Sequence, residues 1–283
     1  MTRKLLVLST VFSCLVSGIF TFESSNAAAK KLTAEEVVAR HIESIGSPDK
    51  LASIQSRTVY GTASVQRPVG TLPQILPEAG KRTEAGNFLL ASADRNLAMV
   101  MRFYDPDYPG EHFAFDGKSA TVSFIGANKQ SVLGEFIDSR SGLMREGLLG
   151  GVLSTAWPLL NAPAGQFKLK YEEVKIGGTR FHEISYIPKS RRYLEKMAVC
   201  MIFDFESYRH VMTEYANVMN DGSRASPHVI EQFGNFRNVD GLTLPFSYSI
   251  ECPGSRPYSN RWAIEVRQVN HNGPLDPQLF KAP

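Results

Sequence analysis

The chain has 283 residues, of which 43% are hydrophobic and 21% are charged, and its formal net charge at pH 7 is +3. This composition is typical of a globular protein, and a chain of this length holds enough apolar material for a substantial hydrophobic core. Lys and Arg form no run long enough for a nucleic-acid surface, so nucleic acid is not an expected partner.

Residues 1–29 have the order of a secretory signal peptide. The basic pair Arg3–Lys4 is followed by an apolar stretch, Leu5 to about Phe22, and then, after a polar patch, by Ala27–Ala29. We therefore predict export, cleavage at about Ala27 to Ala29, and a single folded domain over residues 30–283. The alternative is an uncleaved anchor, because the apolar stretch is nearly long enough to span a bilayer.

The mature chain is predicted to begin with one helix. Thr33 and Glu36 have the T-x-x-E spacing of a capping box, which marks a helix start. Gly46 marks its end. A helix this short needs a surface to pack against. Its expected buried face, at helical spacing, consists of Val38, His41, Ile42 and Ile45.

From about Arg57 onward, apolar residues recur at every second position, which is typical of strands with one buried face. Turn signals such as Asp116-Gly117 and Asp240-Gly241 separate several of these stretches, and the short connections favour an antiparallel meander. The sequence therefore predicts a mainly β protein with about ten strands and a few helices. The strands are expected near residues 59–65, 97–103, 113–124, 167–187, 197–203, 208–215, 229–236, 242–250 and 262–266.

Residues 143–160 are the other substantial apolar segment, and they do not alternate. Gly150-Gly151 and Pro158 interrupt this segment, so it is a poor membrane span and is predicted to form two short helices against the sheet. One interpretation is a mobile lid over an apolar cavity, and the other is core packing that never moves. The glycines of the segment each lower helix stability by about 1 kcal/mol relative to Ala, which both interpretations allow.

The sequence contains no specific catalytic motif. Its histidines form neither HxH nor HExxH, and GxSxG, GxGxxG and P-loop patterns are absent. We therefore expect no enzyme, no metal site and no cofactor. An active site assembled from distant residues is an alternative that the sequence leaves open.

Cys200 and Cys252 are the two cysteines of the predicted mature chain. In an oxidising compartment they form either a disulfide or two buried free thiols. A disulfide here would close a loop of about 50 residues and stabilise the fold by about 4 kcal/mol.

Six segments follow one another along the chain: Leu32–Ile42 with Ile45-Gly46, Ser56–Gly61, FYDPDYPGEHFAF at Phe103–Phe115, REGLLGGVLSTAWPLL at Arg145–Leu160, Phe236–Pro245, and Pro274-Leu275-Asp276 with Phe280. In this order they resemble exported bacterial proteins of the outer-membrane lipoprotein-sorting group. The resemblance implies the fold of the periplasmic lipoprotein carriers and their outer-membrane receptors, a strongly curved antiparallel sheet, or incomplete β-barrel, with helices covering its concave face. The carriers' polar lid-holding residue matches no position here, so none is assigned.

The same resemblance implies a periplasmic protein that binds or carries a lipid or an acylated lipoprotein in an apolar cavity under a helical lid. Other envelope proteins are expected as partners. The alternative is a non-enzymatic envelope scaffold or assembly module whose cavity is permanently plugged. Alternation selects the residues expected to line the cavity, although an error of one residue would reverse the face. They are Val59, Met99, Met101, Phe113, Phe115, Leu148, Leu149, Leu153, Trp157 and Leu160.

Overall fold

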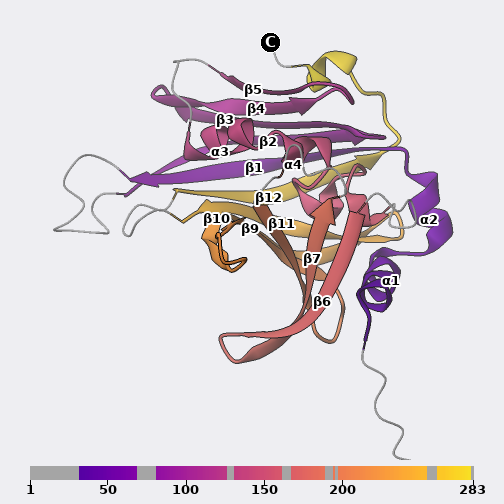
Figure 1. Ribbon diagram of the computed structural model, residues 1–283. Coiled ribbons are helices and arrows are strands. Elements are labelled where there is room, and N and C mark those ends of the chain that lie inside the picture. The colour runs from indigo at the N-terminus through magenta and orange to yellow at the C-terminus, as the bar shows by residue number, and fades with distance from the viewer. Residues whose placement is uncertain are drawn as a thin grey trace, which may run out of the picture. The chain divides into compact units, whose positions relative to one another are not determined.

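Within the described residues, twelve strands pair into one antiparallel sheet (Figure 1). The computed structural model describes residues 32–68, 81–125, 131–160, 167–188, 194, 197–253 and 260–281. The mainly β fold class with few helices is therefore confirmed. The predicted signal peptide lies outside the described residues, so export and cleavage remain predictions.

The sheet consists of two meanders, β1 to β5 and β6 to β12, joined where β1 pairs with β12. The order across it is β5-β4-β3-β2-β1-β12-β11-β10-β9-β8-β7-β6, so β5 and β6 are the two edges. The chain between β5 and β6 must therefore pass from one edge of the sheet to the other. The strands are β1 Ser56–Pro68, β2 Lys81–Ala93, β3 Asn96–Asp105, β4 Tyr108–Phe115, β5 Ala120–Phe124, β6 Phe167–Ile176, β7 Thr179–Pro188, β8 Met197–Asp204, β9 His210–Val218, β10 Arg224–Val239, β11 Leu242–Cys252 and β12 Asn260–His271.

One face of the sheet, here called the inner face, carries the hydrophobic core. The register places Phe88 opposite Met101 and Met99 opposite Phe113, and all four side chains are buried. Arg102, one position out of phase, is exposed, as the period of two requires. In Figure 1, β1 to β5 run across the view whereas β6 and β7 run steeply, so the strand direction turns along the sheet.

The first helix, α1 (Ala34–Ile45), begins at the predicted capping box. Glu36 N donates to Thr33 Oγ1 over 3.2 Å, and Thr33 N donates to Glu36 Oε2 over 2.9 Å. Helix α1 packs near β11 and β6. Of its predicted apolar face, Val38, His41 and Ile45 are buried and Ile42 is partly buried.

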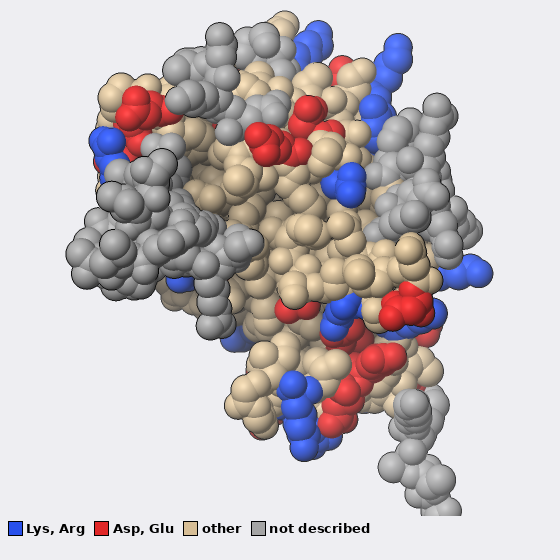
Figure 2. Space-filling model, turned by 60° about the vertical axis from the view of Figure 1, so that its left-hand side comes forward, with Lys and Arg blue, Asp and Glu red and all other residues tan. Residues whose placement is uncertain are grey.

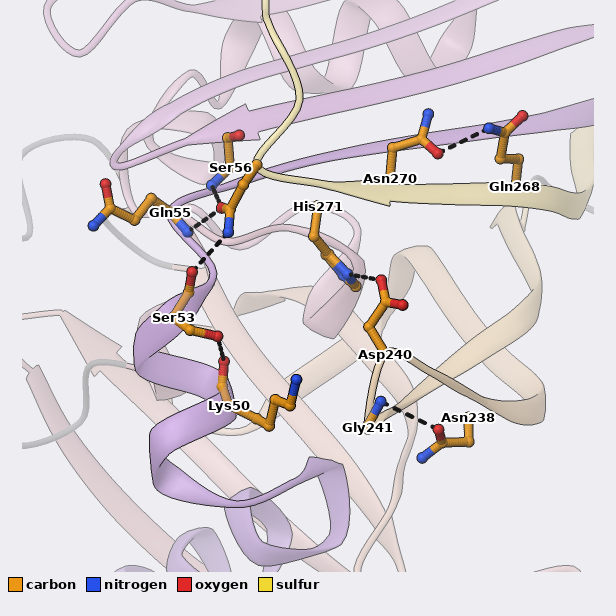
Figure 3. Close-up of polar contacts among 11 residues, drawn as sticks. Lys50, Ser53, Gln55, Ser56, Asn238, Asp240, Gly241, Gln268, Asn270 and His271 are labelled. Atoms are coloured by element: carbon orange, nitrogen blue, oxygen red, sulfur yellow. Dashed lines mark hydrogen bonds and ion pairs between the residues drawn. The ribbon is translucent and has the colours of Figure 1, made fainter.

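The junction between α2 (Pro48–Ser53) and β1 is fixed by Asn272, which directly follows β12. Figure 3 labels the three residues whose backbone it binds, Ser53, Gln55 and Ser56. Asn272 Oδ1 accepts hydrogen bonds from the backbone nitrogens of Gln55 and Ser56, at 2.9 and 3.3 Å, and its Nδ2 donates to Ser53 O over 2.8 Å. Its φ of +55° lies in the left-handed region, which Asn tolerates better than most residues. The three bonds set where the first residues of β1 lie.

Residues 131–160, here called the covering segment, connect the edge strands β5 and β6 and pack against the inner face. They form α3 (Val132–Ser139), α4 (Gly142–Arg145) and the short 3₁₀ helix η1 (Gly151–Leu153). The prediction of two short helices within 143–160 is only partly right: α4 overlaps the start of that stretch, and the rest contains single 3₁₀ turns at residues 151–153 and 158–160 rather than an α-helix. The cause is local: the φ values of Gly147, Gly150 and Gly151 are +68°, +77° and +48°, which an α-helix does not contain.

Cys200 on β8 and Cys252 on β11 are both buried and free. Three steps across the sheet separate these strands, about 14 Å at about 4.8 Å per step, whereas the Cα atoms of a disulfide lie at most about 7 Å apart. Of the two alternatives, the structure therefore has buried thiols rather than the disulfide. Burial raises the pKa of Cys200 to about 11 and that of Cys252 to about 12.

The charged side chains of the described residues are mixed in sign on the face that Figure 2 shows. They lie mostly near its margins, and Lys and Arg alternate there with Asp and Glu, so this face carries no extended basic tract of the kind that binds nucleic acid. Among the described helices, none is both long and apolar enough to span a bilayer.

Candidate functional site

The structure brings the ten predicted lining residues into one hydrophobic cluster. Nine of them are buried, and Leu160 is partly buried at the margin of the cluster. They meet where the covering segment packs on the inner face. The strand residues are Val59, Met99, Met101, Phe113 and Phe115, and those of the covering segment are Leu148, Leu149, Leu153, Trp157 and Leu160.

Gly150 and Gly151 lie between two distant parts of the sheet. A methyl group at the Cβ position of Gly150 would stand 2.7 Å from Leu90 Cδ1 on β2 and 3.8 Å from Met99 Cε on β3. One on Gly151 would stand 2.8 Å from Phe233 Cζ on β10 and 3.0 Å from His210 Nδ1 on β9. A Cβ on Gly151 meets two buried rings, whereas one on Gly150 would push aside the end of the Leu90 side chain. Both residues also have a positive φ, which favours glycine, so this part of the covering segment depends on glycine.

Glu231 on β10 binds the backbone of the covering segment from the inner face of the sheet. It is fully buried and accepts a hydrogen bond from Gly150 N over 2.9 Å. Tyr215 Oη lies 2.6 Å from Glu231 Oε2 and 2.9 Å from Leu148 O, and Tyr248 Oη donates to Glu231 Oε1. Desolvation by burial raises the pKa of Glu231 above its ordinary value.

Arg57 on β1 binds the covering segment at a second point. The side chain is 1% exposed, and its Nη1 donates to the carbonyl oxygen of Val152 in η1. Its Nε has no hydrogen-bond partner in the described structure. Burial lowers its pKa to about 10, and no nearby carboxylate opposes that effect. Burying a cation without a counter-ion costs several kcal/mol of desolvation free energy, so Arg57 is an unusual residue for this position.

Glu111 on β4 binds the covering segment at a third point, the start of α3. Ser131 N donates to Glu111 Oε1 over 3.0 Å, and Ser131 Oγ donates to Oε2 over 2.8 Å. Tyr108 Oη also donates to Oε2, over 2.8 Å. Because Ser131 Oγ accepts from Gly134 N over 3.0 Å, the carboxylate positions the residue that caps α3.

An aromatic group that includes two histidines lies around Trp157. The Trp157 ring stacks on His210, with 4.9 Å between centroids, and meets His41 of α1 edge-on at 5.2 Å. His41 Nδ1 lies 2.8 Å from Tyr208 O, and His210 Nε2 lies 2.8 Å from Thr213 Oγ1. The opposite nitrogens, His41 Nε2 and His210 Nδ1, and Trp157 Nε1 have no hydrogen-bond partner in the described structure.

We expect His41 and His210 to lower the free energy of unfolding as the pH drops from about 6.5 to about 4.5. Burial lowers the pKa of His41 to about 4 and that of His210 well below 6.5. The unfolded chain then binds protons that the folded protein does not, so acid favours unfolding, and the shift of His41 alone corresponds to about 3 kcal/mol. Urea unfolding at both pH values measures the loss, and His41→Gln serves as the control. A wild-type loss no larger than that of the variant would contradict the assignment.

Two cavities adjoin this region or lie near it. One of about 330 Å³ opens between α1, α2 and the covering segment, and its lining is Ile42, Pro48, Leu51, Ala52, Ile54, Arg57, Thr155 and Leu160. Another of about 520 Å³ is lined by residues of β1 to β4 and of the stretch 276–281. Of the ten predicted lining residues, only Leu160 lines either of these two cavities.

The sequence analysis missed Arg57, Glu111 and Glu231, although the sequence carries a signal for each. Arg57 precedes inward-facing Val59 by two positions, Glu111 precedes Phe113 by two, and Glu231 precedes Phe233 by two. Since side chains two apart in a strand share a face, all three charged residues are in phase with the apolar face. A charge in that phase indicates a buried polar group with a specific partner.

The described residues contain no cluster of three or more His, Cys, Asp or Glu side chains arranged to hold a metal ion. His41 and His210 contact backbone carbonyls and Thr213 rather than a carboxylate, so these two histidines do not form a general-base pair. What the site offers chemically is an apolar interior, closed by a segment that is held through its backbone.

No protein-family model matches the chain, and no curated protein matches it. Similar solved structures include a LolA superfamily protein from Nitrosomonas europaea, with 12% identity and a TM-score of 0.48 over 89% of this chain and 99% of that one. A DUF1329 family protein from Desulfovibrio piger has 11% identity and a TM-score of 0.49, over 87% and 96% of the two chains.

A third similar structure is a domain named for outer-membrane lipoprotein sorting, from Vibrio parahaemolyticus, with 9% identity and a TM-score of 0.45 over 86% and 97% of the chains. The similar structures thus include members of the group that the sequence resembles. At TM-scores below 0.5 they do not bear on the function of this chain.

Proposed function

We propose that this protein is an exported, periplasmic carrier that holds a lipid or an acylated lipoprotein between the inner face of its sheet and the covering segment, which acts as a lid. It is proposed to have no catalytic activity and to exchange its ligand with other envelope components. One observation carries the proposal. The covering segment is attached to the apolar inner face by three separate buried ionisable side chains, Arg57, Glu111 and Glu231, each of which binds its backbone.

Polar attachment of this kind suits a segment that moves. When the segment lifts, water can replace the hydrogen bonds to its backbone at a net cost of about 1 kcal/mol each. The apolar surface that becomes exposed costs about 25 cal/mol per Å², and an acyl chain that covers the same surface recovers that cost. An acyl ligand therefore stabilises the lifted state, whereas water alone does not.

The proposal includes a sheet that curves around the covering segment as an incomplete barrel. In a flat sheet, β3 and β9 would stand about 29 Å apart, six steps of about 4.8 Å. Yet Met99 on β3 and His210 on β9 both reach the dipeptide Gly150-Gly151, whose Cα atoms are about 3.8 Å apart. These contacts support a sheet bent strongly enough to bring its two halves toward each other.

The second candidate is an envelope scaffold whose interior is permanently filled. The observation that favours it is the packing of the predicted lining residues. Met99, Leu148 and Trp157 belong to one hydrophobic cluster, and all three side chains are fully buried. The two candidates differ in whether the covering segment opens. A scaffold binds no hydrophobic probe at protein concentrations where a carrier does.

Mass spectrometry of organic extracts tests the carrier function. The mature protein is purified without detergent from its exported form, extracted, and compared with an unrelated exported protein from the same cells. The carrier function predicts an acyl-chain lipid in a fixed ratio to protein and absent from the control. Repeated preparations that contain no such lipid, together with no uptake of the uncharged probe N-phenyl-1-naphthylamine, would favour the scaffold.

A further inference from the structure

The Arg57 guanidinium is a buried cation whose counter-ion is missing among the described residues. Its one hydrogen bond goes to the neutral carbonyl of Val152, and its Nε has no partner. By contrast, the partly exposed Arg224 pairs with Glu183, at 2.9 Å. Buried charges in proteins are almost always paired, so an unpaired one beside a cavity indicates that the anion comes from outside the chain.

The cavity of about 330 Å³ beside Arg57 is where such an anion would enter. Its volume is at the lower end of the range of small-molecule sites. The walls combine apolar side chains, among them Ile42 from α1, Leu51 from α2 and Leu160 from the covering segment, with polar surface, and Arg57 is the charged residue that lines the cavity. Thr155 contributes a hydroxyl, which already contacts Ser92 Oγ at 3.0 Å.

We propose that this cavity binds the anionic head group of an amphiphile, a carboxylate or a phosphate on an apolar tail, with Arg57 as its counter-ion. The inference rests on the proposed carrier function and names the chemistry of its ligand. A guanidinium presents parallel N–H groups that match both oxyanions, and its attraction is strong where water is excluded. Because the covering segment contributes Thr155 and Leu160, a tail that continues from the head group runs beneath that segment.

The test is calorimetric titration of the full mature protein with amphiphiles below their micelle concentrations. Dodecanoate and dodecyl phosphate supply the two oxyanions, glycerol monododecanoate supplies the same tail without charge, and acetate and inorganic phosphate supply the charge without the tail. We expect both anionic amphiphiles to bind about 10- to 100-fold more tightly than the neutral ester, the usual effect of a hydrogen bond to a charged group. Acetate and phosphate alone should bind far more weakly.

Variants then assign the preference to Arg57. Arg57→Met should bring the anionic and neutral amphiphiles to equal affinity, while Arg57→Lys, which keeps the cation, should retain part of the preference. Lys50→Met is the matched control, because Lys50 is an exposed cation on neighbouring α2 and its loss should leave the preference unchanged. If Arg57→Met does not fold, the affinities of wild type for the charged and neutral amphiphiles, together with those of Arg57→Lys, still test whether Arg57 gives the preference for an anion.

The outcomes separate the two proposals. Equal affinity of wild type for charged and neutral amphiphiles, or a preference that survives Arg57→Met, would overturn the inference and leave the carrier function standing. Binding of free acetate or phosphate as tight as that of the amphiphiles would overturn the proposed ligand class. If no amphiphile binds at all, the carrier function itself fails.

Discussion

Glu111→Gln is expected to lower the free energy of unfolding by about 2–3 kcal/mol, whereas Glu231→Gln is expected to change it by less than about 1 kcal/mol. Both carboxyl groups are fully buried, and desolvation raises the pKa of each. The difference between them comes from counting the protons that their partners supply.

At Glu111 every partner donates. Ser131 N, Ser131 Oγ and Tyr108 Oη each direct a proton at the carboxylate, and Tyr108 Oη in turn accepts from Trp262 Nε1 over 3.2 Å. The carboxylate satisfies all three donors without a proton of its own. An amide at this position turns an N–H group toward a donor in either orientation, so at least one bond to a charged acceptor is lost.

At Glu231 the count requires one more proton. The four contacts join Gly150 N, Tyr248 Oη and Tyr215 Oη to the carboxyl group, and Tyr215 Oη to Leu148 O. Tyr215 has one hydroxyl proton, so it can donate to Leu148 O only if Glu231 donates to Tyr215. A protonated carboxylic acid meets this requirement. The Nε2 of Gln can make the same donation to Tyr215, and the second N–H of the amide, which has no acceptor among these four contacts, accounts for the small expected cost.

Urea unfolding of the two variants at pH 7 measures the contrast. The pH dependence gives a second readout, because the folded protein keeps a proton on Glu231 that the unfolded chain releases above its ordinary pKa of 4.5. Stability from this group is therefore present at low pH and is lost as the pH rises through the folded-state pKa, and Glu231→Gln should lack that loss. Equal destabilisation by the two substitutions would show that the proton count is wrong.

Trp157→Ala is expected to lower the free energy of unfolding by about 3–5 kcal/mol, the usual cost of emptying a fully buried tryptophan site. Trp157 is fully buried between His41 and His210, in the part of the core that joins α1 to the covering segment. The vacated volume lies beneath that segment, so the variant should also bind N-phenyl-1-naphthylamine more tightly than wild type does.

Phenylalanine variants of both tryptophans supply the matched control. Trp157 Nε1 has no hydrogen-bond partner in the described structure, so Trp157→Phe loses only packing, about 1–2 kcal/mol. Trp262 is also fully buried, but its Nε1 donates to Tyr108 Oη, so Trp262→Phe should cost about 1 kcal/mol more. A larger loss from Trp157→Phe than from Trp262→Phe would contradict this assignment of contacts.

The alternation of apolar residues predicts most of the sheet because pleating fixes the face on which each side chain lies. It fails at β2, Lys81–Ala93. Phe88, Leu89, Leu90 and Ala91 form a continuous apolar run, and Ala91 is buried on the outer face against Phe280 near the C-terminus. A strand covered on both faces loses its alternation, so the sequence alone does not mark it.

The residues of the candidate site can be predicted only in part from the sequence, for similar reasons. His210 faces inward because the pairing of β8 with β9 shifts by one residue between Ile202 and Phe203, and that bulge breaks the phase counted from Thr213. The covering segment has no period at all, since its glycines turn the chain at positive φ. Its contacts to β1, β4 and β10 join residues as far apart as Arg57 and Val152, and no local pattern encodes such pairs.

The most direct test of whether the covering segment opens is to link it to the sheet by a disulfide. Thr155 Oγ1 of the covering segment lies 3.0 Å from Ser92 Oγ on β2, so cysteines at these two positions have their sulfur atoms within bonding reach. The pair is introduced into a chain carrying Cys200→Ala and Cys252→Ala, and uptake of N-phenyl-1-naphthylamine is measured before and after oxidation. If the segment is a lid, oxidation abolishes uptake and reduction restores it. Uptake that is the same in the oxidised and reduced forms would show that ligands do not enter beneath this segment.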